Sequence, residues 1–137
     1  MKIINLTPHS ISVFSAEQFT NLERLDATTW IADGTQGEAL AFYPTPEVAA
    51  RISTSVKEVE SDLPGEVVET TYGEATGIPE NVSNLDFLIV SLPTKSMAVG
   101  SGHPRACQMY SPYKVVRLRG EDGKGTGTVL GCMGFTR

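Results

Sequence analysis

The stretch LDFLIVSL, residues 85–92, decides the fold of this chain. Six of its eight positions are apolar, and Asn84 and Pro93 bound it on either side. A short apolar run between two turn-forming residues is typical of a strand that is buried on both faces. We therefore predict that residues 85–92 form the central strand of a sheet.

The chain after this strand alternates between turn signals and short periodic segments. Residues 94–99 predict one or two turns of helix, which GSG at 100–102 would end. Residues 114–119 and 128–135 both read as strands. The glycine-rich segment between them resembles a phosphate loop, but Lys124 is followed by Gly rather than by Ser or Thr. A hairpin tip is the favoured interpretation of that segment.

The chain before the central strand begins with two predicted strands. Residues 2–6 and the alternating residues 11–14 are separated by the turn TPH, so the second is predicted to return beside the first. SAEQ at 15–18 is a capping-box pattern, and apolar residues follow it at near-helical spacing. A short amphipathic helix is therefore predicted over residues 16–26.

The segment from 39 to 84 is predicted to be mostly strand and loop. Residues 39–43 form a short strand, and residues 48–60 fit a strand better than a helix because β-branched residues dominate them. DLPG at 62–65 would then turn the chain into a second strand over 67–72. Together these elements predict an α+β fold. We expect a mostly antiparallel β single domain, residues 1–137, with one or two short helices.

The charge is distributed unevenly along the chain. Residues 1–94 carry four Lys and Arg against fourteen Asp and Glu, whereas residues 95–137 carry seven against two. An acidic protein of net charge −5 is not expected to bind duplex nucleic acid. The basic final third either receives a small anion or attracts the acidic part, within the fold or between subunits. The second interpretation predicts a homo-oligomer.

No apolar run approaches the roughly 20 residues that a membrane helix needs, so we expect no membrane partner. No signal-peptide core follows Met1, so we expect the protein to stay in the cytoplasm where it is made.

Few residues suggest catalysis or metal binding. His9 and His103 are the only histidines, and neither has a second histidine three or four residues away. Cys107 and Cys132 lack the CxxC spacing and are expected to be small buried thiols. The GxSxG elbow of many hydrolases is also absent. We predict no catalytic residue, metal or cofactor, and we favour a binding protein while leaving an enzyme open.

The end of the central strand is the best candidate for a binding site. Ser91 ends that strand, and the free N–H groups of a following helix start would favour an anion. Arginine offers a planar fork to phosphate, and tyrosine can stack on a base. An ordinary strand-to-helix cap with solvated charges is the alternative. The predicted ligand-binding residues are Ser91, Thr94, Lys95, Ser96, His103, Arg105, Tyr110 and Arg117.

Several short motifs occur in an order that is itself informative. They are NLTPH at 5–9, ARIST at 50–54, GE at 73–74 with GIP at 77–79, IVS at 89–91, Arg105, and Gly127 through GC at 131–132. In this order they resemble a family of small proteins that is common in tailed-phage genomes. Those proteins often have Arg-x-Asp where Arg105 is followed here by Ala106 and Cys107, so no role is carried over to that acidic position.

The resemblance implies a phage-type accessory protein acting in the host cytoplasm. Small phage proteins often antagonise host immunity, and by analogy this chain would bind and sequester a nucleotide-derived immune signal. The ligand would be a cyclic nucleotide or an ADP-ribose isomer, a small anion that suits the basic site. The alternatives are a non-enzymatic, protein-binding inhibitor of a host defence effector and a minor virion or structural protein.

Overall fold

The predicted central strand is present as β10 (Phe87–Ile89) in the computed structural model, which describes residues 1–137. It lies between β1 (Ile3–Asn5) and β11 (Met109–Arg119) and runs parallel to both. Residues 88–90 are at most 1% exposed, which confirms burial on both faces. The strand is shorter than the predicted residues 85–92, because Leu85 is 71% exposed before it and Leu92 already begins the following helix.

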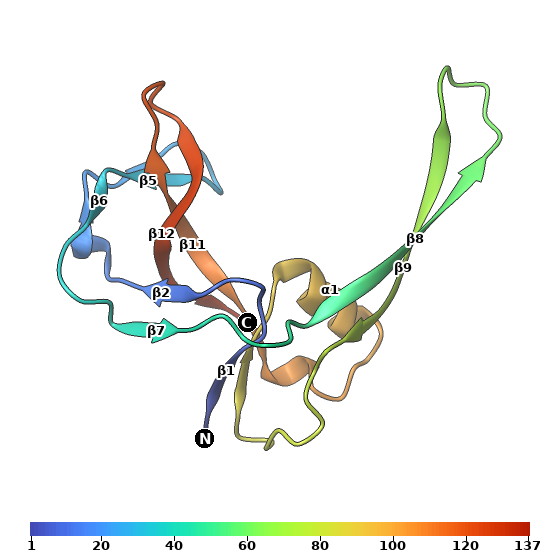
Figure 1. Ribbon diagram of the computed structural model, residues 1–137, viewed down its shortest axis with the longest axis horizontal. Coiled ribbons are helices and arrows are strands. Elements are labelled where there is room, and N and C mark those ends of the chain that lie inside the picture. The colour runs from blue at the N-terminus through green and yellow to red at the C-terminus, as the bar shows by residue number, and fades with distance from the viewer.

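The main sheet continues from β11 through strands that are distant in sequence. β11 pairs antiparallel with β12 (Gly125–Thr136), and β12 pairs in turn with β2 (Ile11–Val13). β7 (Ala41–Tyr43) completes that side, antiparallel to β2. The outer half of β11 also pairs with β5 (Trp30–Ala32), and the strands curl into a nearly closed, barrel-like arrangement (Figure 1).

The fold class is confirmed in its coarse form, a mostly β domain with one α-helix. The sheet, however, is mixed rather than mostly antiparallel, because β10 has a parallel neighbour on each side and β11 runs parallel to β5. Long crossover segments join these parallel strands, and such connections leave little trace in local sequence patterns.

The predicted helix over residues 16–26 is wrong. Only a 3₁₀ turn, Ala16–Gln18, forms, although Gln18 Oε1 does accept from the Ser15 N–H at 3.0 Å as the capping pattern predicted. The chain then enters β3 (Phe19–Thr20), which pairs with β6 (Gly34–Thr35). Asn21 has a φ of 52°, a left-handed conformation that an α-helix cannot include. The next strand is β4 (Glu23–Arg24), which lies beside β5.

The first two strands form as predicted, but they do not pair with each other. β1 hydrogen-bonds to β10, and the Leu6 N–H continues this ladder to the Ile89 carbonyl at 2.8 Å. β2 instead pairs with β7 and β12. The turn between them therefore carries the chain from one part of the sheet to another.

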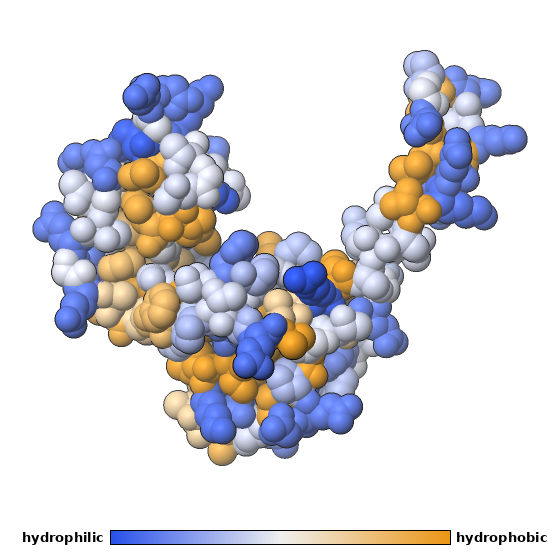
Figure 2. All heavy atoms as spheres, viewed as in Figure 1, coloured by the Kyte–Doolittle hydropathy of each residue, from blue (hydrophilic) through white to orange (hydrophobic).

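The predicted hairpin over residues 48–72 is confirmed and is longer than expected. β8 (Arg51–Val59) and β9 (Val67–Thr76) form a two-stranded arm, and Gly65 turns with a φ of 90°. The base of the arm contacts α1 (Leu92–Gly100), the helix predicted after the central strand. Figure 1 shows the outer part of the arm extending away from the body, and Figure 2 shows apolar residues along it.

The core is small and divided into three clusters. Only 22 of 137 residues are buried, and the largest cluster surrounds Leu88 and Val90 beneath α1. A second cluster contains Phe14 and Phe19, whose rings meet edge to face at 5.6 Å. Cys132 belongs to the third cluster, as expected of a buried thiol.

Cys107 corrects the expectation for the other thiol, because it is exposed. It lies in the short 3₁₀ turn Ala106–Gln108, where the buried side chain is that of Gln108 instead. The glycine-rich segment is a hairpin tip as predicted, with Gly123 at a φ of 78° between β11 and β12. No helix is both long and apolar enough to cross a bilayer.

Candidate functional site

The NLTPH motif forms a turn that is held from inside by one buried asparagine. Asn5 Nδ2 donates to the carbonyls of His9 at 2.7 Å, Pro44 at 3.1 Å and Tyr43 at 3.3 Å. Its Oδ1 accepts from the Thr7 N–H at 2.9 Å. Thr7 Oγ lies 2.7 Å from that same oxygen and 2.9 Å from the His9 carbonyl, so its single proton serves either one. Asn5 thus fixes the backbone path of the turn and leaves the His9 side chain exposed.

A cavity of about 640 Å³ lies against this turn. It is bounded by the turn and β2 on one side, by Ser91 at the start of α1, and by residues of β11 and β12 on the other. We call it the Arg117 cavity. Its lining residues are Thr7, Pro8, His9, Ser10, Ile11, Ser12, Ser91, Pro112, Val115, Arg117, Gly127, Val129, Leu130, Gly131 and Cys132.

The charges of this lining differ from those of the whole protein. Arg117 and His9 are the only ionisable side chains apart from the Cys132 thiol, and no carboxylate is present. The Arg117 side chain is exposed, and its Nη1 contacts only the carbonyls of Thr126 at 3.4 Å and Gly127 at 3.5 Å. Both distances are at the long limit for a hydrogen bond. The guanidinium is therefore available for an anion.

The serine hydroxyls add neutral donors. Ser10 is exposed just before β2, Ser12 is half-buried in the middle of β2, and neither hydroxyl forms a hydrogen bond within the protein. Ser91 Oγ lies 2.9 Å from Thr94 Oγ1. Burial raises the pKa of the Cys132 thiol, so this group remains protonated and adds no negative charge. The cavity can thus donate hydrogen bonds to an anion without opposing it electrostatically.

The structure brings two of the predicted ligand residues, Ser91 and Arg117, to this cavity. Thr94 is 2% exposed and supports Ser91 from within the first turn of α1. Lys95 Nζ reaches the Thr136 carbonyl at 3.4 Å, outside the lining. Ser96 is exposed on α1 and also lies outside the lining.

The remaining predicted residues lie elsewhere on the body. Arg105 Nη1 donates to Asn84 Oδ1 at 2.7 Å and to Gln108 Oε1 at 3.1 Å. The backbone N–H of Arg105 donates to His103 Nδ1 at 3.0 Å. Tyr110 packs edge to face on Phe87, with ring centroids 5.4 Å apart. His103, Arg105 and Tyr110 therefore have partners within the protein, and their roles as ligand contacts stay predictions.

His9, Ser10 and Ser12 were not among the predicted site residues. The sequence does contain a signal for them, because NLTPH is the first of the ordered motifs, but TPH on its own reads only as a turn. The last of those motifs, residues 127–132, lines the same cavity. Three motifs that are far apart in the chain, at 5–9, 89–91 and 127–132, thus contribute to one site.

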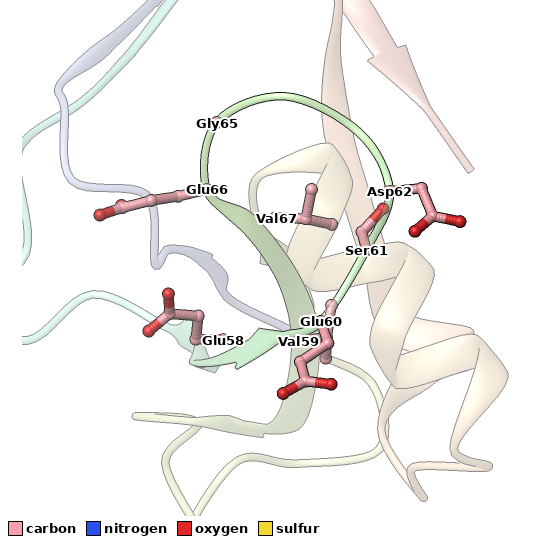
Figure 3. Close-up of a pocket in the computed structure, with 8 residues that line it drawn as sticks. All are labelled: Glu58, Val59, Glu60, Ser61, Asp62, Gly65, Glu66 and Val67. Atoms are coloured by element: carbon pink, nitrogen blue, oxygen red, sulfur yellow. The ribbon is translucent and has the colours of Figure 1, made fainter.

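A second cavity, of about 790 Å³, lies at the tip of the arm and carries the opposite charge. Glu58, Glu60, Asp62 and Glu66 surround it, and Figure 3 shows their carboxylates pointing in different directions from the two strands and the turn. No three His, Cys, Asp or Glu side chains in the chain are grouped so as to hold a metal ion. The tip is therefore described as an acidic surface and not as a site.

Comparisons with models of protein families, with curated proteins and with solved structures find no match to this chain. Function is therefore inferred from the cavity and from its residues.

Proposed function

We propose that this protein binds and sequesters a small anionic, nucleotide-derived ligand in the Arg117 cavity. The observation that carries the proposal is the charge of the lining. Arg117 and His9 stand among hydroxyls with no carboxylate, in a protein whose net charge is −5. The carboxylates that give the protein its negative charge repel an anion, whereas at the cavity the nearest ionised group is a cation.

The size and the wall of the cavity suit a nucleotide. Its volume of about 640 Å³ falls within the range of about 300–1,000 Å³ that is usual for small-molecule sites. The Arg117 fork can bond a phosphate through two nitrogens, and the serine hydroxyls can bond phosphate or sugar oxygens. Val115, Val129 and Leu130 supply an apolar wall for a base.

The resemblance to small tailed-phage proteins supports a particular class of ligand. A protein that removes a signal from a host cytoplasm must bind it without needing to transform it. Cyclic nucleotides and ADP-ribose isomers have the charge, the hydroxyls and the flat base that this cavity can contact. The two classes differ in the number of phosphates, which a binding panel resolves.

A retention experiment tests this proposal. The purified protein is incubated with cyclic dinucleotides, cyclic trinucleotides and cyclic ADP-ribose isomers, separated from free compound, and denatured by heat. We expect one class to be recovered intact from the wild type and to be lost from Arg117→Ala. A chemically altered product would identify an enzyme instead. The proposal would be overturned if the protein retained none of these compounds and if calorimetric titration detected no heat of binding for any of them.

The second candidate function is that of a protein-binding inhibitor or a minor virion component. The extended arm favours it, because a two-stranded hairpin that projects into solvent offers a surface suited to another protein. Absence of retention in the experiment above would leave this candidate in first place.

A further inference from the structure

The chain exposes more surface than a monomer of its size. Its accessible surface is 9038 Å². Folded monomeric proteins of 14.7 kDa expose about 6,900 Å². The excess, about 2,100 Å², shows that the fold is less compact than a typical monomer of this size.

One face of the arm accounts for part of this excess. Residues directly opposite each other in an antiparallel pair project from the same face. The pairs Thr54 with Tyr72, Val56 with Thr70, and Glu58 with Val68 therefore share one face. On it Val56 is 63% exposed, Tyr72 55% and Val68 50%. We call this the apolar face of the arm, and Figure 2 shows apolar side chains in the middle of the arm.

The opposite face of the arm is polar over the same length. Ser55 lies opposite Thr71, and Lys57 lies opposite Glu69, while Val59 and Val67 form an apolar pair at the outer end of this face. The outer arm is thus amphipathic, although no other part of this chain lies against it (Figure 1). An isolated two-stranded hairpin is at best marginally stable in water, and it needs a third strand or a packing surface. The apolar face therefore needs a partner.

We infer that the apolar face of the arm docks on a second copy of this chain. Charge complementarity favours this partner. Residues 51–76 carry six Asp and Glu against two Lys and Arg, whereas residues 95–137 of the body carry seven Lys and Arg against two Asp and Glu. Across a two-fold axis each acidic arm meets the basic part of the other copy, and the contact is made twice.

The area agrees with such a pair. A pair in which each copy covered the whole excess of about 2,100 Å² would bury about 4,200 Å², which is the upper limit for this interface. That area lies within the range of about 2,000–5,000 Å² found for obligate homodimers. The inference goes beyond the ligand-binding proposal and does not depend on it, because assembly is measured without ligand.

The test is a mass measurement on the ligand-free protein and on matched variants. Light scattering after size exclusion, at tens of micromolar protein and moderate salt, is expected to give twice the chain mass of 14.7 kDa for the wild type. The double variant Val56→Glu, Val68→Glu places two charges on the apolar face. It is expected to weaken self-association about a hundredfold or more, leaving monomer at the same concentration.

The control is Ser55→Glu with Thr71→Glu, which adds the same charges to the polar face at neighbouring positions. It is expected to keep the wild-type mass, and circular dichroism shows whether both variants keep their strand content. A monomeric wild type overturns the inference. So does an apolar-face variant that is folded and retains the wild-type mass.

A further variant tests the role of the acidic residues at the tip of the arm. Glu60→Lys with Glu66→Lys removes the charge complementarity and leaves the apolar face intact. Self-association is expected to weaken at low salt and to approach the wild-type value at high salt, where charges are screened. Unchanged association of this variant at low salt would contradict docking on the basic part of a second copy.

Discussion

Arg117 and Arg119 lie two positions apart on β11, yet only Arg119 is paired with carboxylates. Arg119 Nη1 donates to Glu23 Oε2 at 2.6 Å, and its Nε donates to Asp33 Oδ1 at 2.9 Å. Arg117 reaches only backbone carbonyls. A register shift between the two residues interrupts the ladder with β12. One arginine therefore ties loops to the sheet, while its neighbour remains available to a ligand.

Arg117→Ala is expected to weaken binding of the compound retained in the panel by about tenfold to a hundredfold. Loss of a charge-assisted hydrogen bond costs about 1.5–3 kcal/mol, which corresponds to that factor. Arg117→Lys is expected to recover only part of the loss, because an ammonium group lacks the planar fork. Calorimetric titration measures both affinities, and the melting temperature is expected to stay at the wild-type value.

Arg119→Ala is the matched control for Arg117→Ala on the same strand. It removes the hydrogen bonds to Glu23, Asp33 and the Asn21 carbonyl, so the melting temperature is expected to fall. Affinity for the ligand is expected to be unchanged because Arg119 does not line the cavity. If the two variants showed the opposite pattern, the assignment of roles to the two arginines would be wrong.

Asn5→Ala is expected to destabilise the fold and to weaken ligand binding. The substitution removes the donor to the His9 and Pro44 carbonyls and the acceptor of the buried Thr7 N–H, and an unsatisfied buried polar group costs about 1–3 kcal/mol. The turn that presents His9 also loses its internal support. Urea unfolding and a binding titration measure the two effects, with the exposed Asn81→Ala as a control that should change neither.

Gly131→Ala is expected to destabilise the protein by about 1–3 kcal/mol, the usual cost of overpacking. A Cβ at this position would lie 2.7 Å from Phe14 Cδ2 and 2.8 Å from the Ser12 carbonyl oxygen, because β12 passes close to β2. Gly134→Ala on the same strand has open space and should cost far less. If the two variants unfolded at the same urea concentration, Gly131 would not lie as close to Phe14 and Ser12 as the structure places it.

Asp86 is expected to make stability depend on pH. Hydrogen bonds from the backbone N–H groups of Ser83 and Lys2 lower the pKa of Asp86 below its ordinary value of 3.8. Because the pKa is lower in the folded state, the ionised Asp86 carboxylate stabilises the fold in full at pH values above its ordinary pKa. This stabilisation is lost as the pH falls through the pKa of the folded state. The stability difference between wild type and Asp86→Asn should therefore be constant near neutral pH and shrink below about pH 4.

Thermal melts between neutral pH and about pH 2.5 measure that difference. Asp62→Asn is the control, since Asp62 is an exposed residue at the arm tip whose carboxylate does not accept a backbone hydrogen bond. A difference between wild type and Asp86→Asn that persists unchanged at the lowest pH would contradict the role given to the two backbone donors.

Local signals in the sequence predicted the elements whose stability is local. The apolar run at 85–92 predicted β10, and DLPG predicted the arm, because each pattern is contained in a few consecutive residues. The helix over 16–26 failed because Phe19 packs against Phe14 and its backbone pairs with β6, both of which are tertiary contacts. The parallel pairings of β10 and β11 were missed because they too join segments that are distant in the sequence.

Residue chemistry predicted part of the candidate site. Ser91 and Arg117 were chosen as a hydroxyl and a guanidinium near the central strand, and both line the cavity. The same chemistry also selected Arg105, whose partners Asn84 and Gln108 are visible only in three dimensions. His9 was missed because its turn is fixed by hydrogen bonds that the Asn5 amide donates to the carbonyls of Tyr43 and Pro44, which are distant in sequence.

The order in which strands pair has a consequence for how the chain is made. Ile3 lies opposite Phe87, and Val13 lies opposite Cys132. During synthesis β1 therefore leaves the ribosome long before its partner β10 exists. β2 can pair early with β7, but it must wait for almost the entire chain before it meets β12. Folds dominated by such distant pairings have a high contact order and fold slowly. β1 consequently remains unpaired on the nascent chain until β10 has been made, and an unpaired strand edge of this kind promotes aggregation unless a chaperone covers it.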